Sequence, residues 1–218
     1  MNQKLAAWLN AGGVVAPLLW ASAVIYSGTR HPEYSHVRQY ISDLAARGSS
    51  TQHLMQAAGF ILPGLMMAGF GVLLGLRAAA KAAGIGSALL IVGGLARAAA
   101  GIFLPDPPGD ALHPTFMARL HNGAGVMYGV TFTLAVLVWF LATWREARAP
   151  GWFAWYSLVT VAAAVAASFA LIGAGIAAPG DVGLFQRAWL GSLNIWMLVF
   201  ALLAHVQSRR TTVNVWRA

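Results

Sequence analysis

Six long apolar stretches dominate this chain of 218 residues. A helix needs about 20 apolar residues to cross the hydrocarbon core of a bilayer, and stretches of that length lie at 6–28, 53–76, 82–104, 115–144, 152–178 and 184–206. Their apolar residues run continuously instead of alternating, which favours helices over a β-barrel. The sequence therefore predicts an all-α bundle of six transmembrane helices, forming a single integral membrane domain over residues 1–218.

The composition excludes several classes of protein. Charged residues make up 9% of the chain and apolar residues 59%, whereas soluble domains carry about 25% charged residues. The net charge of +8 does not indicate a nucleic-acid partner, because the basic residues cluster at the ends of the spans. The chain has no cysteine, which excludes disulfides and thiolate metal ligands. We expect membrane lipid as a partner, expect no nucleic acid, and leave a protein partner open.

The basic residues also predict an orientation. Six spans place both termini on one side, where eight basic residues lie: Lys4, Arg77, Lys81, Arg145, Arg148, Arg209, Arg210 and Arg217. The other side carries five: Arg30, Arg38, Arg47, Arg119 and Arg187. Positive charge favours the cytoplasm, so we expect a multi-pass protein of the cell inner membrane with both termini cytoplasmic. Five of the six acidic residues then fall on the outer side: Glu33, Asp43, Asp106, Asp110 and Asp181.

The first outer loop is too long for a simple turn. Within it, Val37, Ile41 and Leu44 recur at helical spacing, which predicts a short amphipathic helix over 35–47 lying on the membrane surface. This helix has two alternative roles. It plugs the bundle, or it covers a pocket with Asp43, His36 or Tyr40 turned inward.

The second outer loop, after residue 104, is stiffened by prolines and holds Asp106. Asp106, His113 and His121 are the candidate metal ligands, with zinc as the metal considered. His113 and His121 are eight residues apart, about 12 Å along a helix axis, so His113 would have to lie off the helix to share an ion. The chain has no pair of histidines one turn apart, and the metal signal is weak.

Several cationic or polar side chains are expected at a similar depth. Arg97 lies about 10 Å inside the third span by helical rise, where an arginine normally faces the bundle interior or a wet cavity. Arg187 opens the sixth span, where free backbone amides favour an anion such as a lipid phosphate. The sequence predicts an outward-facing ligand pocket formed by Arg97, Arg119, His121 and Arg187. The alternative for Arg97 is snorkelling toward the membrane surface or a structural hydrogen bond.

Three short motifs, taken in their order along the chain, resemble a known family. They are Tyr40-Ile41-Ser42-Asp43-Leu44, Phe103-Leu104-Pro105-Asp106 with His113 downstream, and Gly183-Leu184-Phe185-Gln186-Arg187. Together they resemble the domain of unknown function 998 family of prokaryotic multi-span membrane proteins, over nearly the whole chain. The Ile-Ser-Asp element is also similar to one in Frag/DRAM/Sfk-type membrane proteins. The resemblance implies the architecture and no settled activity. It also implies that Asp43, Asp106, His113 and Arg187 are functional residues, and more weakly Ser42.

Two classes of function remain at this stage. The first is a membrane protein without catalytic activity whose outer polar pocket binds a lipid or a small ligand. The second is a metal-dependent lipid hydrolase, for which Ser42, Asp43, Asp106 and His121 are the catalytic candidates and a metal-bound water would attack an ester or amide. A haem protein and a small transporter are weaker alternatives. The non-catalytic class ranks first, because the chain lacks the paired histidines of known multi-span lipid hydrolases.

Overall fold

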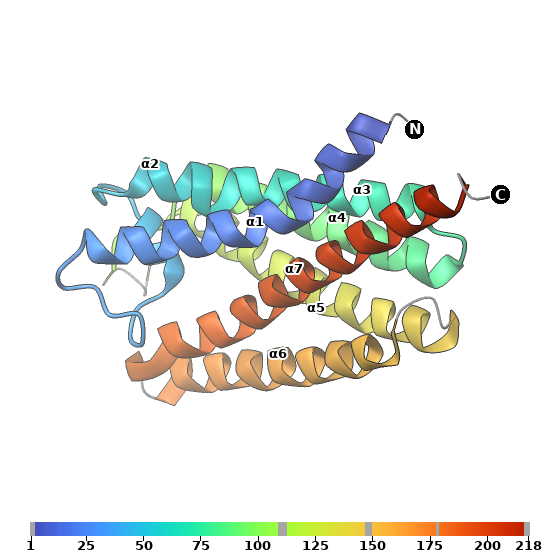
Figure 1. Cartoon of the computed structure of the whole chain (residues 1–218). Coiled ribbons are helices and arrows are strands. Elements are labelled where there is room, and N and C mark those ends of the chain that lie inside the picture. The colour runs from blue at the N-terminus through green and yellow to red at the C-terminus, as the bar shows by residue number, and fades with distance from the viewer. Residues whose placement is uncertain (1–2, 109–112, 147–149, 178, 216–218) are drawn as a thin grey trace.

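The computed structural model describes residues 3–108, 113–146, 150–177 and 179–215. All of the long elements in these residues are helices (Figure 1). In chain order the elements are α1 (Gln3–Thr29), η1 (Ile41–Ala45), α2 (Gln52–Leu54), η2 (Met55–Ile61), α3 (Leu62–Arg77), α4 (Lys81–Ile102), α5 (Phe116–Glu146), α6 (Gly151–Ala177), η3 (Pro179–Asp181) and α7 (Val182–Val215). Within the described residues, six helices are long and apolar enough to cross a membrane, the second being the continuous run α2–η2–α3. The predicted six-helix, all-α architecture is confirmed. Asp110, Arg148 and Arg217 lie outside the described residues.

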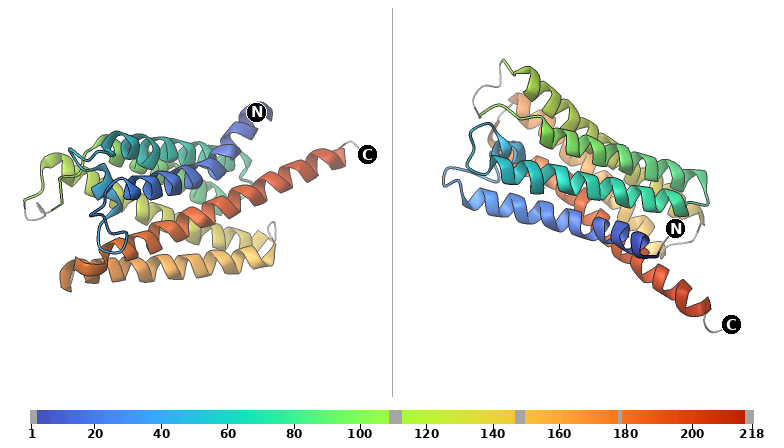
Figure 2. Two further views of the ribbon diagram at one scale, coloured as in Figure 1. Left: turned by 60° about the vertical axis from the view of Figure 1, so that its left-hand side comes forward. Right: turned by 90° about the horizontal axis from the view of Figure 1, so that it is seen from above.

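The six spans are arranged as a ring. Each packs against the next along the chain, and α1 closes the ring by contacting α7, which also touches α5. Both termini lie at one end of the bundle (Figure 1), and the two turned views show the same arrangement (Figure 2). We call that end the terminal end. The loop end is the opposite one, formed by residues 30–51, 103–108, 113–115 and 179–181.

The ring is apolar both inside and outside. Its interior is a continuous cluster rich in aromatic rings, in which Phe153 stacks on Trp196 and Phe200 at centroid distances of 5.9 and 5.3 Å. Its outer surface carries large exposed apolar side chains, such as Phe169 at 70% and Ile176 at 84% exposure on α6. A water-soluble protein would bury such side chains, whereas a bilayer solvates them. The two apolar surfaces therefore agree with a bundle surrounded by lipid.

The second span changes its helical register in the middle. Residues 55–61 form a π-helix, in which the Leu62 amide donates to the Ala57 carbonyl five residues back. Pro63 follows directly, near the start of α3. Proline has no amide hydrogen and its ring displaces the carbonyl four residues back, so the ladder of hydrogen bonds must open there. The π-segment directly before Pro63 is where this span departs from the regular α-helical ladder.

Close packing of α3 on α4 depends on two facing glycines. A methyl group added to Gly94 would lie 2.5 Å from the Gly64 carbonyl oxygen and 2.6 Å from the Ala68 amide nitrogen. The same addition at Gly64 would meet the Gly94 carbonyl oxygen at 2.5 Å. Small residues at such positions let the backbones of membrane helices approach each other, and packing rather than hydrophobicity drives their association.

The first loop contains a shorter helix than the expected 35–47. It is a single 3-10 turn, Ile41–Ala45, preceded by non-helical turns at 36–39. Ile41 and Leu44 are buried against α1 and η2 instead of lying along a membrane surface, while Val37 is 44% exposed. The segment therefore plugs the loop end of the bundle, which was one of the two expected roles.

We predict that Gly94→Ala destabilises the protein, because its methyl group would overlap backbone atoms that cannot rotate away. Overpacking of this kind costs about 1–3 kcal/mol. Gly84→Ala is the matched control, since Gly84 lies on the same helix with nothing within 4 Å of an added methyl group. Unfolding by heat or denaturant in one detergent measures both. Equal stability of the two variants would contradict the α3–α4 contact.

Candidate functional site

The carboxyl end of α4 is capped by side chains from neighbouring helices. The last carbonyls of a helix have no partner within it. His121 Nδ1 donates to the carbonyl oxygens of Ala100 and Phe103 at 2.7 and 3.0 Å, and Gln56 Nε2 donates to the Gly101 carbonyl oxygen at 3.1 Å. His121 is 4% exposed. Nδ1 of His121 therefore carries the ring hydrogen, and the side chain caps the carboxyl end of α4.

The start of α5 is held by Asp106. The carboxylate of Asp106 accepts hydrogen bonds from the Thr115 amide at 2.7 Å and the Thr115 hydroxyl at 2.8 Å. Thr115 Oγ1 in turn accepts from the Ala118 amide at 3.2 Å, as an N-cap residue does. These bonds, with a smaller contribution from the charge of Arg47, keep the pKa of Asp106 below its ordinary value. Asp106 closes the second loop.

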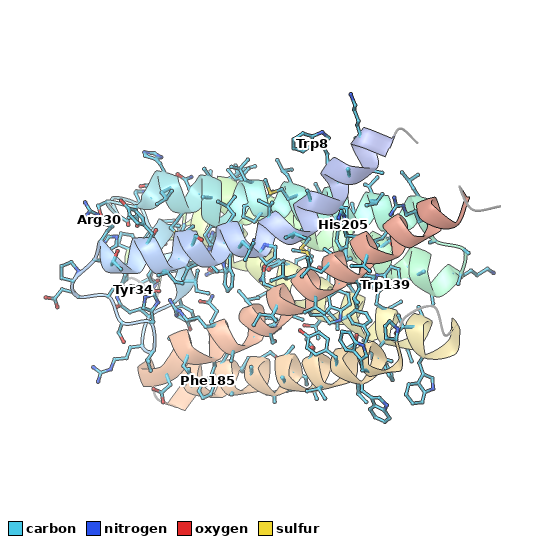
Figure 3. The ribbon with its side chains drawn as sticks, in the orientation of Figure 1. Trp8, Arg30, Tyr34, Trp139, Phe185 and His205 are labelled. Atoms are coloured by element: carbon cyan, nitrogen blue, oxygen red, sulfur yellow. The ribbon has the colours of Figure 1, made fainter. Side chains whose placement is uncertain are left out.

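Arg187 fastens the first loop to the start of α7. Its Nη1 donates to the carbonyl oxygens of Gln39 and Gly183 at 3.0 and 2.9 Å, and its Nη2 donates to the Tyr34 hydroxyl. The guanidinium also lies over the Tyr34 ring, 5.6 Å from its centroid. The Tyr34 hydroxyl in turn donates a hydrogen bond to the Tyr40 carbonyl oxygen at 2.9 Å. Figure 3 shows Tyr34 and Phe185 at the loop end.

Two backbone contacts complete this junction. The Leu184 amide donates to the Val37 carbonyl oxygen at 2.9 Å, and the Ile41 amide donates to Gln186 Oε1 at 2.6 Å. Gly183 makes the approach feasible, because an added methyl group would lie 2.8 Å from the His36 carbonyl oxygen and closer still to that of Gln39. The motifs at 40–44 and 183–187 are therefore two halves of one contact.

Arg97 is fully enclosed in the bundle, at 1% exposure. Its Nη1 donates to the Tyr128 hydroxyl at 3.2 Å and Asn194 Oδ1 at 3.1 Å, and its Nη2 donates to the Gly59 carbonyl oxygen at 3.1 Å. In a regular α-helix the Gly59 carbonyl would accept from the amide of residue 63, and Pro63 has none. Arg97 thus supplies the donor that the proline removes, and the partners described for it are neutral.

Asp43 lies in the first loop, half-buried beside the Arg187 junction. Its Oδ2 accepts from the Tyr40 amide at 2.9 Å. Burial raises the pKa of Asp43 from 3.8 to about 6, and the Tyr40 hydrogen bond and the charge of Arg187 offset only part of that rise. Ser42 is adjacent and half-buried. Among the described residues, no hydrogen bond joins Ser42 to a histidine.

A histidine outside the predicted set, His31, lies in a hydroxyl cluster of the same loop. Its Nε2 is 3.1 Å from Ser49 Oγ and 3.0 Å from Thr51 Oγ1. Both hydroxyls also reach the Leu44 carbonyl oxygen, at 2.9 and 3.0 Å. Each hydroxyl has one hydrogen to donate, so the Leu44 carbonyl oxygen and His31 Nε2 compete for the hydrogens of Ser49 and Thr51. The shortest hydrogen bond of Ser49 Oγ in this cluster is the one it donates to the Leu44 carbonyl oxygen, at 2.9 Å.

A cleft opens at the loop end beside these groups. It has a volume of about 280 Å³ and lies between residues 31–49 and the proline turn. Its charged or titratable lining residues are His31, Glu33, Tyr34, Asp43 and Arg47, and its apolar wall includes Leu44, Pro107 and Pro108. The Arg47 amide donates to the Pro105 carbonyl oxygen at 3.2 Å, which joins the two loops across the cleft.

The predicted pocket residues do not line one cavity. Arg97 lies inside the bundle, His121 caps α4, Arg187 fastens the first loop, and Arg119 is exposed on the first turn of α5. None of the four lines the cleft. Their role in binding a ligand stays a prediction. Sequence reasoning missed His31, Glu33 and Arg47, whose only signal was that they share one long loop.

The candidate metal ligands, whose binding of an ion stays a prediction, are separated in the described structure. Within the described residues, no group of three or more histidine, aspartate or glutamate side chains lies close enough to hold one. His121 directs Nδ1 to two carbonyls, and Asp106 is bonded to Thr115. His113 is exposed in the loop. No step through zinc is derived from these residues.

We predict that Arg97→Met destabilises the protein by at least about 1–3 kcal/mol, the cost of leaving a buried polar group without its partner. Pro63→Ala should recover part of that loss, because alanine restores an amide for the Gly59 carbonyl. The double variant should therefore lose less than the sum of the single changes, as measured by unfolding in one detergent. Strict additivity would disprove the link between Pro63 and Arg97.

We also predict that the first loop loosens as pH rises. Because the pKa of Asp43 is raised when the loop is packed, the stability it contributes is fully present below pH 3.8 and is lost as pH rises through about 6. The difference is at most about 3 kcal/mol, and less because the side chain is partly exposed. Hydrogen exchange over residues 40–47, corrected for intrinsic rates, measures it. Asp43→Asn should remove the pH dependence, whereas Glu33→Gln should retain it.

Comparison with known proteins supplies a family. Residues 14–203 match the family described as "Protein of unknown function (DUF998)". No curated protein and no solved structure matches the chain. The similarity to Frag/DRAM/Sfk-type proteins is not confirmed. The match spans most of the chain and includes the motifs at 40–44, 103–106 and 183–187, so this multi-span membrane protein belongs to the DUF998 family.

Proposed function

We propose that this protein is a binding protein without catalytic activity, and that its loop-end cleft holds the polar headgroup of a membrane lipid or a small polar ligand. The observation that supports the proposal is that the polar side chains at the loop end fall into two sets, one bonded to the backbone at helix ends and loop junctions and the other lining the cleft. His121, Gln56, Asp106 and Arg187 serve helix ends and loop junctions. Glu33, Asp43 and Arg47 instead line a cleft of about 280 Å³.

The size of the cleft favours a small polar group. Ligand pockets for drug-sized molecules begin at about 300 Å³, so a volume of about 280 Å³ suits a headgroup better than an extended molecule. The apolar surface of the bundle keeps the acyl chains of surrounding lipids close to the loop end. A lipid can therefore offer its headgroup to the cleft without leaving the bilayer.

A hydrolase is supported less well by the same residues. Nucleophilic catalysis needs a base within hydrogen-bond reach of the nucleophile, and the described residues give Ser42 no such histidine. His31 Nε2 lies within hydrogen-bond distance of the Ser49 and Thr51 hydroxyls, but both hydroxyls also donate to the Leu44 carbonyl oxygen, which competes with the histidine for their hydrogens.

We further propose that the loop end faces outward from the cell inner membrane and that both termini are cytoplasmic. The support is the excess of basic residues toward the terminal end. Lys4, Arg77 and Lys81 belong to that side of the chain, and the loop end carries Glu33, Asp43 and Asp106.

The orientation is tested with fusions to the full chain. A reporter that is active only in the cytoplasm should be active when attached at Ala218, and a tag inserted after Pro108 should react with an impermeant reagent in intact cells. Both results together support the orientation. A C-terminal reporter that is active only outside the cell would overturn it.

Binding is tested by measuring phospholipid retained on detergent-purified protein with native mass spectrometry. Arg47→Gln should lower retained phospholipid by about tenfold or more, because a hydrogen bond to a charged group is worth about 1.5–3 kcal/mol. Arg38→Gln is the matched control, since Arg38 is exposed in the same loop and does not line the cleft. Equal retention by the two variants would disprove binding at the cleft. Arg119→Gln in the same assay tests the exposed member of the originally predicted pocket.

A further inference from the structure

The cleft carries charges of both signs, and this narrows the class of its ligand. Glu33 and Asp43 supply two carboxylates, and Arg47 supplies one guanidinium. Arg187, which is near enough to influence Asp43, is engaged with the carbonyls of Gln39 and Gly183 and with Tyr34. Asp43 is therefore left without a committed cation. The charge of Arg47 also acts on Asp106, but the Asp106 carboxylate is bonded to Thr115, so the Arg47 guanidinium can meet an anion in the cleft.

From this arrangement we infer that the cleft binds an ammonium–phosphate zwitterion of the ethanolamine phosphate type, with its ammonium against Asp43 and Glu33 and its phosphate against Arg47. The inference rests on the proposed binding function and names the ligand class. A phosphate is recognised well by the planar guanidinium of an arginine. A primary ammonium has three hydrogens to donate and suits carboxylate acceptors.

Two related headgroups fit the cleft less well. A quaternary ammonium such as choline has no hydrogen to donate and is typically held by aromatic faces. Of the cleft's lining residues Tyr34 has a phenol ring, and one face of that ring is occupied by the Arg187 guanidinium 5.6 Å from its centroid, so an aromatic cage is not formed by the described lining. An anionic headgroup such as glycerol phosphate has no cation to place beside the two carboxylates, and like charges at short distance disfavour each other.

The cleft groups are held in place by the backbone around them. Asp43 accepts from the Tyr40 amide at 2.9 Å, and Tyr34 is fixed by Arg187 and by its bond to the Tyr40 carbonyl oxygen. The Arg47 amide is bonded to the Pro105 carbonyl oxygen at 3.2 Å. A fixed Asp43 carboxylate, and a fixed backbone at Arg47, lower the entropic cost of ordering a flexible headgroup.

The test compares three phospholipids that have the same acyl chains and differ in headgroup: phosphatidylethanolamine, phosphatidylcholine and phosphatidylglycerol. Each is offered to the purified full-length protein and counted by native mass spectrometry. We expect phosphatidylethanolamine to bind at least about tenfold more tightly than the others. Asp43→Asn combined with Glu33→Gln should reduce it to the level of phosphatidylcholine. Arg47→Gln should weaken all three, and Arg38→Gln should change none.

The outcomes separate the inference from the proposed function. Equal binding of the three lipids, all lowered by Arg47→Gln, would overturn the zwitterion and leave the cleft as a binding site. Tighter binding of phosphatidylglycerol would also overturn the zwitterion. Binding insensitive to Arg47→Gln would overturn the proposed function itself. Melting temperatures of the variants check folding, and the exposed Glu33 and Arg47 should leave them unchanged.

Free phosphoethanolamine distinguishes the source of the zwitterion. If it displaces phosphatidylethanolamine at a similar concentration, the cleft recognises the soluble molecule and the acyl chains contribute little. If it fails to compete while the headgroup preference holds, the ligand is the lipid. Both results support the same headgroup chemistry at Asp43, Glu33 and Arg47.

Discussion

Within a bilayer no water is available to satisfy an open backbone carbonyl, and this constraint organises the polar residues of the bundle. Pro63 removes the amide that would serve the Gly59 carbonyl, and Arg97 replaces it from the third span. At the end of α4, His121 and Gln56 do the same for carbonyls that a helix end always leaves open. The costly side chains inside this membrane protein are thus explained by the backbone they complete.

The same constraint separates structure from binding at the loop end. A side chain whose polar atoms all serve a helix end or a loop junction has none left for a ligand, whereas Asp43 gives only its Oδ2 to the Tyr40 amide. Once Arg187, His121 and Asp106 are assigned to those tasks, the charges of the cleft remain, from Glu33, Asp43 and Arg47. Of the two histidines that suggested a metal, His121 donates to two carbonyl oxygens at the end of α4 and His113 is exposed in the second loop. A binding role therefore agrees with the geometry better than a catalytic one.

The candidate site could be predicted only in part. The motifs around Asp43 and Arg187 indicated that these two residues matter. The contact between the two segments could not be predicted, because Arg187 makes it through the backbone carbonyls of Gln39 and Gly183, which leave no pattern in the sequence. In place of the helix expected over 35–47 the structure has one 3-10 turn, in which Ile41 and Leu44 are buried against α1 and η2. Spacing cannot tell a surface helix from an inward plug when both need apolar residues three and four apart.

By itself, the sequence determined the number of spans, their approximate limits and the side of the chain on which acidic residues gather, because these depend on the length and apolarity of local segments. Tertiary structure alone decided which polar groups are free. Arg97 became a donor to Gly59 because α4 packs beside the π-segment, and Glu33, Asp43 and Arg47 came to share a cleft because the first loop folds over the bundle. Such pairings join residues far apart in the chain, so their chemistry emerges only after the helices have packed.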